Sequence, residues 1–230
     1  MRRALILLLI LTLLAPLAPT AAAGQQIGGA GDVLDWSARE LDGYYRTLFA
    51  LGGNIDEYTT PRVTILAHGE TVSTGCTGPI MGDDLAFYCS LDAHIVMSEV
   101  FLDELAEGDD FLPAYVLAHE WAHHIQRLSG TIPVYVAQDG DWNQVYIIEN
   151  ELRADCLAGA WMGNVAHRGY LNATDMSAVF AKALEVGDSG IYGRTRSHGT
   201  GVERLRAVFL GYEEGALGCM SITPLPRGGM

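Results

Sequence analysis

The stretch His119-Glu120-Trp121-Ala122-His123 has the spacing HExxH, with two histidines four residues apart and an acid beside the first. On an α-helix, residues four apart lie about 40° apart around the axis and roughly 6 Å along it, so both imidazoles can reach one metal ion. Glu120 then lies where it can meet a water molecule beside the metal. His124 points about 100° away from His123, so we expect it to have a packing or surface role. A hydrolytic zinc site typically takes three protein ligands, so the chain has to supply a third ligand elsewhere.

A second helical run from Ile147 to Trp161, IIENELRADCLAGAW, carries Glu151 and Asp155 four residues apart on one face. A carboxylate is an acceptable zinc ligand, and a metal-bound imidazole usually donates its other nitrogen to an acid. We therefore predict Glu151 as the third ligand and Asp155 as the acid that orients a histidine. The segment NELRAD is similar to the NExxxD pattern of the thermolysin-like gluzincins, whose second helix supplies the glutamate ligand. Glu149 is the rival ligand, although Arg153 four positions on favours a surface ion pair for it.

The N-terminus has the pattern of a secretory signal peptide, because Arg2 and Arg3 precede an apolar run from Ala4 to Leu17 and small residues up to Ala23. We expect residues 1–23 to be a cleaved signal peptide, residues 24–32 a flexible glycine-rich linker, and residues 33–230 a single domain. An uncleaved anchor is the alternative, although the apolar run is shorter than the ~20 residues of a membrane span. The predicted location is secreted, extracellular or in the cell envelope.

The formal net charge of −14 at pH 7 makes the chain distinctly acidic. Nucleic acids and anionic membrane surfaces bind clustered Lys and Arg side chains, so we expect neither as the main partner. A stable membrane partner is expected only if the N-terminal segment stays uncleaved.

Four cysteines in an exported chain favour two disulfides over free thiols. Cys76 and Cys89 lie close in sequence, whereas Cys156 and Cys219 are far apart. Spacing alone leaves three pairings open, and we favour Cys76 with Cys89 and Cys156 with Cys219.

Hydrophobic periodicity predicts further helices at residues 33–50, 174–187 and 201–213, and β-branched runs predict strands at 62–67, 87–90 and 94–97. Asp109 and Asp110 can cap the HExxH helix, Pro113 is tolerated in its first turn, and Gly130 can end it. Trp121 belongs to an apolar stripe on that helix, so we expect it in the core. The predicted class is α+β, mainly helical with a small antiparallel or mixed sheet.

Several segments, in a fixed order, resemble the bacterial neutral zinc metallopeptidases, a zincin family. The segments are GCTGP (75–79), FYCSLDAHIVMS (87–98), FLDEL (101–105), HEWAHHIQ (119–126), ELRADCLAGAW (151–161) and SHGTGVERLRAVFLGYEEGALGC (197–219). The resemblance implies a zincin-like metallopeptidase domain with an antiparallel edge strand beside the cleft. It also implies one catalytic Zn²⁺ held by His119, His123 and Glu151, and it favours the two disulfides above. Residues 129–145 have no match, which leaves the substrate-facing region undefined.

The segment Ser197-His198-Gly199 is followed by Arg204, which is similar to the His-Pro segment with a later Arg in the CAAX prenyl endopeptidase-like zincins. This resemblance makes His198 a candidate catalytic residue that stabilises the oxyanion, with Tyr146 and Tyr192 as substitutes in that role. A capping or packed loop histidine is the alternative for His198.

The expected function is hydrolysis of a bond in a peptide or protein substrate, with Glu120 as the general base. Residues 92–98 are a candidate for presenting backbone groups to an extended substrate. The alternative function is that of a non-catalytic, secreted, zinc-containing binding or scaffold protein. The HExxH motif taken alone also fits a helix with two solvated histidines and no metal. Cleavage of amide bonds in cell-wall peptides is a further hydrolase reading.

Overall fold

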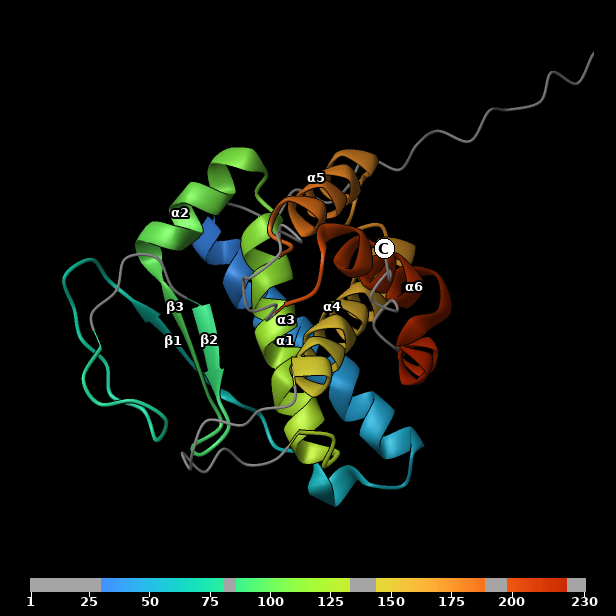
Figure 1. Ribbon diagram of the computed structural model, residues 1–230, viewed down its shortest axis with the longest axis horizontal. Helices are drawn as coiled ribbons and strands as arrows, with labels where there is room; N and C mark the ends of the chain where they lie inside the picture. The colour runs from blue at the N-terminus through green and yellow to red at the C-terminus, as the bar shows by residue number, and fades with distance from the viewer. Residues whose placement is uncertain (1–29, 81–85, 133–143, 189–197, 223–230) are drawn as a thin grey trace, which may run out of the picture.

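The computed structural model describes residues 30–80, 86–132, 144–188 and 198–222, and these contain six α-helices, three β-strands and two 3-10 helices (Figure 1). In chain order they are α1 (Ala30–Leu51), η1 (Ile55–Glu57), β1 (Arg62–Leu66), β2 (Ala86–Cys89), β3 (His94–Ser98), α2 (Glu99–Gly108), α3 (Leu112–Leu128), α4 (Gln144–His167), α5 (Ala173–Glu185), α6 (Gly201–Gly218) and η2 (Cys219–Ser221). The predicted α+β class, mainly helical with a small mixed sheet, is confirmed.

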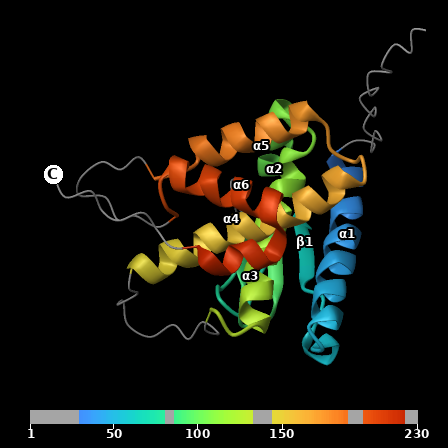
Figure 2. The same cartoon turned by 90° about the vertical axis from the view of Figure 1, so that its right-hand side faces the viewer.

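Helix α3, which carries the HExxH motif, runs through the centre of the molecule between the β-sheet and α4 (Figure 1). Helix α1 packs along α3, and α6 packs along α4 (Figure 2). Leu117 and Trp121 of α3 are each 1% exposed, so Trp121 belongs to the core as predicted. Burial of one aliphatic side chain such as Leu117 stabilises a fold by roughly 1.5–3 kcal/mol, so the core holds α3 firmly in place.

The sheet has the strand order β1-β3-β2, with β1 parallel and β2 antiparallel to β3. His94 of β3 lies opposite Arg62 on one side and Cys89 on the other. Because β3 is the central strand, its backbone groups pair with both neighbours, and the idea that residues 92–98 receive a substrate strand is wrong for β3. Strand β2 lies at the edge of this sheet and contacts α3.

Helix α1 begins at Ala30, so the prediction of a flexible linker over residues 24–32 is wrong for its last three residues. Asp32 in the first turn is favourable at the positive end of the helix dipole. Val33 and Leu34 are 3% and 7% exposed, and their burial outweighs the flexibility of Gly31. The predicted signal peptide, residues 1–23, lies outside the described residues. Within the described ranges, no helix combines the length and apolar character that a bilayer span requires.

Helix α2 is absent from the sequence predictions because the strand before it runs directly into the helix. Ser98 ends β3 and also caps α2, since its hydroxyl accepts a backbone amide of the first turn at 3.2 Å. Helix α3 begins directly after Phe111, without a side-chain cap. The prediction that Asp109 and Asp110 cap α3 is therefore wrong, since the Asp109 carboxylate accepts from the Phe111 amide, before the helix starts.

Two disulfides are present, with the pairing favoured from the sequence. The β2 disulfide joins Cys76 to Cys89, and the α4–η2 disulfide joins Cys156 to Cys219. Helices α4 and α6 also approach so closely that a Cβ atom at Gly211 would lie 1.8 Å from the carbonyl oxygen of Cys156. The α4–η2 disulfide and this backbone contact together hold α4 against the C-terminal part of the described chain.

Candidate metal centre

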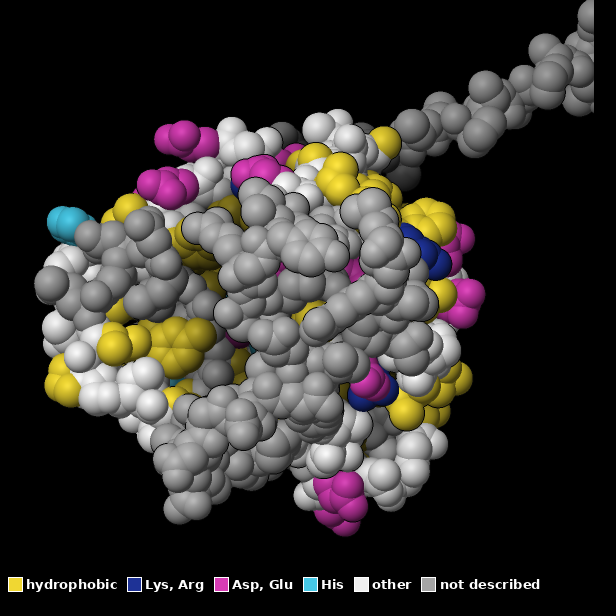
Figure 3. Space-filling view, in the orientation of Figure 1, with side chains coloured by type: hydrophobic (Ala, Val, Ile, Leu, Met, Phe, Trp, Pro, Cys, Tyr) yellow, Lys and Arg dark blue, Asp and Glu magenta, His cyan; other side chains and the backbone are white. Residues whose placement is uncertain are grey.

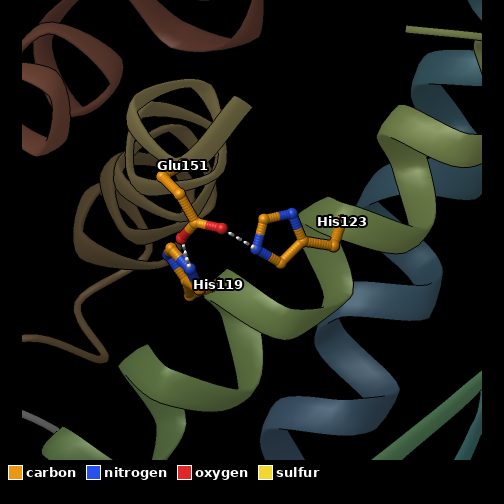
Figure 4. Close-up of side chains that lie close together, drawn as sticks. All are labelled: His119, His123 and Glu151. Atoms are coloured by element: carbon orange, nitrogen blue, oxygen red, sulfur yellow. Dashed lines mark hydrogen bonds and ion pairs between the residues drawn. The ribbon is translucent and has the colours of Figure 1, made fainter. Parts of the chain in front are cut away.

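The two HExxH histidines and Glu151 converge from two helices (Figure 4). His119 and His123 lie one turn apart on α3, and their ring centroids are 4.8 Å apart at an interplanar angle of 90°. Glu151 extends from α4 between the rings, with its Oε2 3.2 Å from His119 Nε2 and its Oε1 3.5 Å from His123 Nε2. One donor atom of each residue lies within 4.8 Å of the other two.

Two imidazole nitrogens and one carboxylate form the donor set of many catalytic zinc sites, and three protein ligands leave a position open for water. Among the described residues, His119, His123 and Glu151 are the one group of three His, Cys, Asp or Glu side chains placed this closely. The residues present therefore fit a zinc ion, and both histidines offer the Nε2 atom to it. The ligand assignment itself stays a prediction.

Asp155 fixes the orientation of the His119 ring. Its Oδ1 lies 2.9 Å from His119 Nδ1, and Asp155 is fully buried. A carboxylate can only accept a hydrogen bond, so Nδ1 carries the proton and donates it. The Nε2 atom of His119 is thereby directed toward Glu151 and the candidate metal position.

Two further buried side chains support Asp155, one from α6 and one from α3. Arg204 of α6 donates from Nε to Asp155 Oδ2 at 2.7 Å and from Nη2 to Oδ1 at 2.8 Å, and the Tyr115 hydroxyl donates to Oδ1 at 2.8 Å. Burial raises the pKa of Asp155, but the Arg204 guanidinium and His119 lower it more, and the pKa falls to about 2. Asp155 is therefore charged at neutral pH. Tyr115 was not predicted as a site residue, although it lies four residues before His119 on the same helical face.

In the metal-free protein, the two imidazoles and the Glu151 carboxylate shift one another's pKa values. Burial lowers the pKa of His119, but Asp155 and Glu151 raise it more, to about 10. The pKa of His123 is also raised, since the nearby Glu151 carboxylate outweighs burial. Burial raises the pKa of Glu151, and the two imidazoles outweigh this and hold it well below its usual range. Because a metal needs neutral imidazoles, metal binding at this site has to release protons.

Glu120 and His124 have different surroundings, although both lie beside the candidate ligand histidines in sequence. Glu120 is 8% exposed on α3, and its charge acts on His123. His124 is fully buried, and its Nε2 donates to the Thr59 carbonyl oxygen at 2.6 Å while the Tyr88 hydroxyl donates to its Nδ1 at 3.0 Å. Burial lowers the pKa of His124. His124 is therefore a packing residue that links α3 to β2, and packing is one of the two roles predicted for it.

The rival candidates from the sequence have separate positions. Glu149, the rival ligand, forms an ion pair with Arg153 one turn further along α4, as its spacing predicts. The side chain of Tyr146 lies outside the described part of the chain, and so does the whole of Tyr192. Their suggested role in oxyanion stabilisation stays a prediction.

His198 is exposed, and its backbone amide donates to the Asp188 carboxylate at 3.0 Å. The next residue, Gly199, is buried and has a φ of +87°, a backbone conformation that favours glycine. A Cβ atom at Gly199 would lie 3.0 Å from Leu152 Cδ2. The loop that carries His198 therefore packs against the residue that follows Glu151, while the catalytic role of the imidazole stays a prediction.

Comparison with known proteins shows one family match. A family model described as "Putative neutral zinc metallopeptidase" matches residues 36–218, which include all three candidate ligands. The chain is 27% identical over 175 residues to the uncharacterized protein YpfJ of Escherichia coli. It is 31% identical over 182 residues to the uncharacterized proteins Rv2575 of Mycobacterium tuberculosis and Mb2605 of Mycobacterium bovis. Each match covers 69% of this chain and 60% of the relative, so the chain spans less than two thirds of these proteins. No solved structure matches the chain significantly.

Proposed function

Since the chain belongs to the "Putative neutral zinc metallopeptidase" family, we propose that it is a zinc-dependent peptidase that holds one zinc ion with His119, His123 and Glu151. The observation that carries the proposal is the direction of the two imidazoles. Both Nε2 atoms face one Glu151 carboxylate, at 3.2 Å and 3.5 Å, and the Nδ1 atom of His119 is occupied by a buried carboxylate. A pair of solvated histidines would not need this support.

In the proposed reaction, a bound zinc ion supplies a Lewis acid that makes water more acidic and polarises a carbonyl group. Glu120 takes the proton of the attacking water and delivers it to the leaving amine. Asp155 keeps the His119 ring in place during the reaction, because its carboxylate is itself held by Arg204. His198 is proposed to donate a hydrogen bond to the substrate oxygen as negative charge develops on it.

The edge strand β2 is the proposed binding element for the backbone of a peptide or protein substrate. Its Tyr88 hydroxyl bonds to His124, the residue directly after the ligand His123. An extended peptide that adds to β2 as a new strand would therefore run beside α3, and its backbone would be recognised by hydrogen bonds common to all sequences.

We also propose that the protein acts outside the cytoplasm, as a secreted or cell-envelope enzyme. The two disulfides support this location, because such bonds persist in oxidising compartments. The net charge of −14 argues against a nucleic-acid partner. In agreement, Figure 3 shows acidic side chains at several places around one face and few basic ones among the described residues. A membrane partner is proposed only if the N-terminal segment is retained.

The test is hydrolysis of a mixed peptide library by the oxidised, zinc-loaded protein and by Glu120→Gln at equal zinc content. We expect the wild type to cleave and Glu120→Gln to keep its zinc but lose at least about 100-fold in rate, since a general base contributes about 10²–10⁴. Equal cleavage by both proteins would refute Glu120 as the base. Zinc binding by both with no cleavage by either would favour the non-catalytic zinc scaffold.

A further inference from the structure

Gln126 lies between the two ligand-bearing helices and has no part in the function proposed above. It is 2% exposed, near the C-terminal end of α3. Its side-chain Oε1 lies 2.8 Å from His123 Nδ1, and its Nε2 lies 2.7 Å from the backbone carbonyl oxygen of Asn150 on α4. Asn150 directly precedes Glu151, so one buried amide contacts one candidate ligand and the neighbour of another.

The contact with Asn150 determines which way the Gln126 amide faces. A backbone carbonyl oxygen can only accept a hydrogen bond, so the NH₂ group of Gln126 has to face Asn150. The Gln126 carbonyl oxygen then faces His123 Nδ1, and this nitrogen has to carry a proton. The remaining nitrogen of the ring, Nε2, is thereby directed toward Glu151, from which it is 3.5 Å away.

Gln126 itself is held in place by helix geometry and by the end of α3. It lies three residues after His123, so the two side chains share a helical face. Its own backbone carbonyl accepts from the amides of Thr131 at 2.8 Å and Ile132 at 3.2 Å, which anchors the last turn. The side-chain amide of Gln126 is therefore held in position in the metal-free protein.

We propose that Gln126 is a positioning residue of the zinc site, which holds the His123 ring with its proton on Nδ1 and its Nε2 free for the metal. The proposal rests on the proposed zinc site. The two histidines thus differ in support, since His119 faces a charged carboxylate and His123 faces a neutral amide. Loss of the Gln126 acceptor should leave the Nδ1–H of the partly buried His123 without this partner and weaken zinc binding.

Three variants separate positioning from a general effect on the fold. Gln126→Met keeps a similar volume but has no strong acceptor. Gln126→Glu keeps an acceptor opposite His123 and loses only the donor to the Asn150 carbonyl oxygen. The matched control is Tyr45→Phe, which removes another buried donor to a backbone carbonyl of α4, the bond from the Tyr45 hydroxyl to Leu157 at 3.1 Å. Within the described part of the chain, the Tyr45 hydroxyl donates to Leu157 and not to any of the three candidate ligands.

The first measurement is zinc affinity, determined by competition with a chromophoric chelator at one fixed pH, together with urea denaturation of each metal-free protein. We expect Gln126→Met to bind zinc about 10–100-fold more weakly, the usual effect of losing a partner of a metal-bound histidine. Gln126→Glu should stay within about tenfold of the wild type. Tyr45→Phe should lower the denaturation midpoint without changing zinc affinity.

The second measurement is ¹⁵N NMR of the zinc-loaded proteins, which tests whether the Nδ1 proton of His123 exchanges slowly enough to be detected. We expect this signal in the wild type and in Gln126→Glu, and its loss in Gln126→Met. Wild-type zinc affinity in Gln126→Met would overturn the proposal, and so would an equal loss of zinc affinity in Tyr45→Phe. If Gln126→Met fails to fold, a loss greater than about tenfold in Gln126→Glu would overturn it. A wild type without zinc affinity would refute the proposed function first, and the role of Gln126 with it.

Discussion

Asp155→Asn removes the negative charge at the centre of the buried network behind the candidate metal centre. Asp155 is 0% exposed, and the side chain of its partner Arg204 is only 9% exposed. The variant keeps the size of the side chain but leaves the Arg204 guanidinium buried beside an amide. It also weakens the acceptor for the Nδ1 proton of His119 and for the Tyr115 hydroxyl.

The expected loss of stability follows from the buried ion pair. Burial raises the pKa of Asp155, but Arg204, and after it His119, lower it more, so that it falls from 3.8 to about 2. This change corresponds to a preference for the charged form of about 2 kcal/mol. Removal of one partner of a buried pair typically costs about 3–5 kcal/mol, because the other charge is left uncompensated. We therefore expect Asp155→Asn to lower the free energy of unfolding of the metal-free protein by about 3 kcal/mol or more.

The assay is urea denaturation at neutral pH, with both disulfides intact, of Asp155→Asn, Arg204→Met and the double variant. Because the double variant removes both charges of the Asp155–Arg204 pair, neither is left without the other, and its loss should be clearly smaller than the sum of the two single losses. The reasoning is refuted if Asp155→Asn costs less than about 1 kcal/mol, or if the two losses simply add.

Three further outcomes follow from the structure. The metal-free protein should lose stability as the pH rises from 6.5 to about 10, because the pKa of His119 is raised to about 10 in the folded state and protonation of His119 therefore favours folding at lower pH. Urea denaturation at both ends of this pH range checks this, and equal stability at the two ends would contradict it. Loss of the α4–η2 disulfide, which closes a loop of 63 residues, should lower the free energy of unfolding by about 4 kcal/mol, and loss of the β2 disulfide, which closes 13 residues, by about 3 kcal/mol. Urea denaturation of two variants, each with one pair of cysteines replaced by alanine, tests this order. Gly211→Ala should destabilise the fold by more than the roughly 1–3 kcal/mol typical of overpacking, because a Cβ atom at Gly211 would lie 1.8 Å from a backbone oxygen of α4. Gly43→Ala on α1 is the control, since a Cβ atom there has no neighbour within 4 Å, and equal urea denaturation midpoints for the two variants would refute the close approach of α4 and α6.

The local part of the site could be predicted because helical spacing alone places residues on one face. His119 with His123, and Glu151 with Asp155, each lie four residues apart, and both pairs face the same place in the structure. The same rule would also have found Gln126, three residues after His123. It was overlooked because a glutamine on a helix gives no chemical signal until its partner is known.

The long-range part could not be predicted from spacing. Arg204 and Asp155 are 49 residues apart, and only the packing of α6 on α4 brings them together. The middle position of β3 was missed for a similar reason, since a buried strand does not reveal its neighbours in the sheet. The predicted start of α1 was wrong because burial of the residues after Gly31 outweighs the low helix preference of this glycine.

The central claim, that Glu151 rather than Glu149 completes a zinc site with the two histidines, is tested most directly by zinc affinity. Chelator competition should be compared for the wild type, Glu151→Gln and Glu149→Gln. We predict a loss of more than about 100-fold for Glu151→Gln, since groups that only support ligands already contribute about 10–100-fold. Glu149 pairs with Arg153 instead, so Glu149→Gln should bind zinc like the wild type. Full zinc affinity in Glu151→Gln, or an equal loss in Glu149→Gln, would contradict the account.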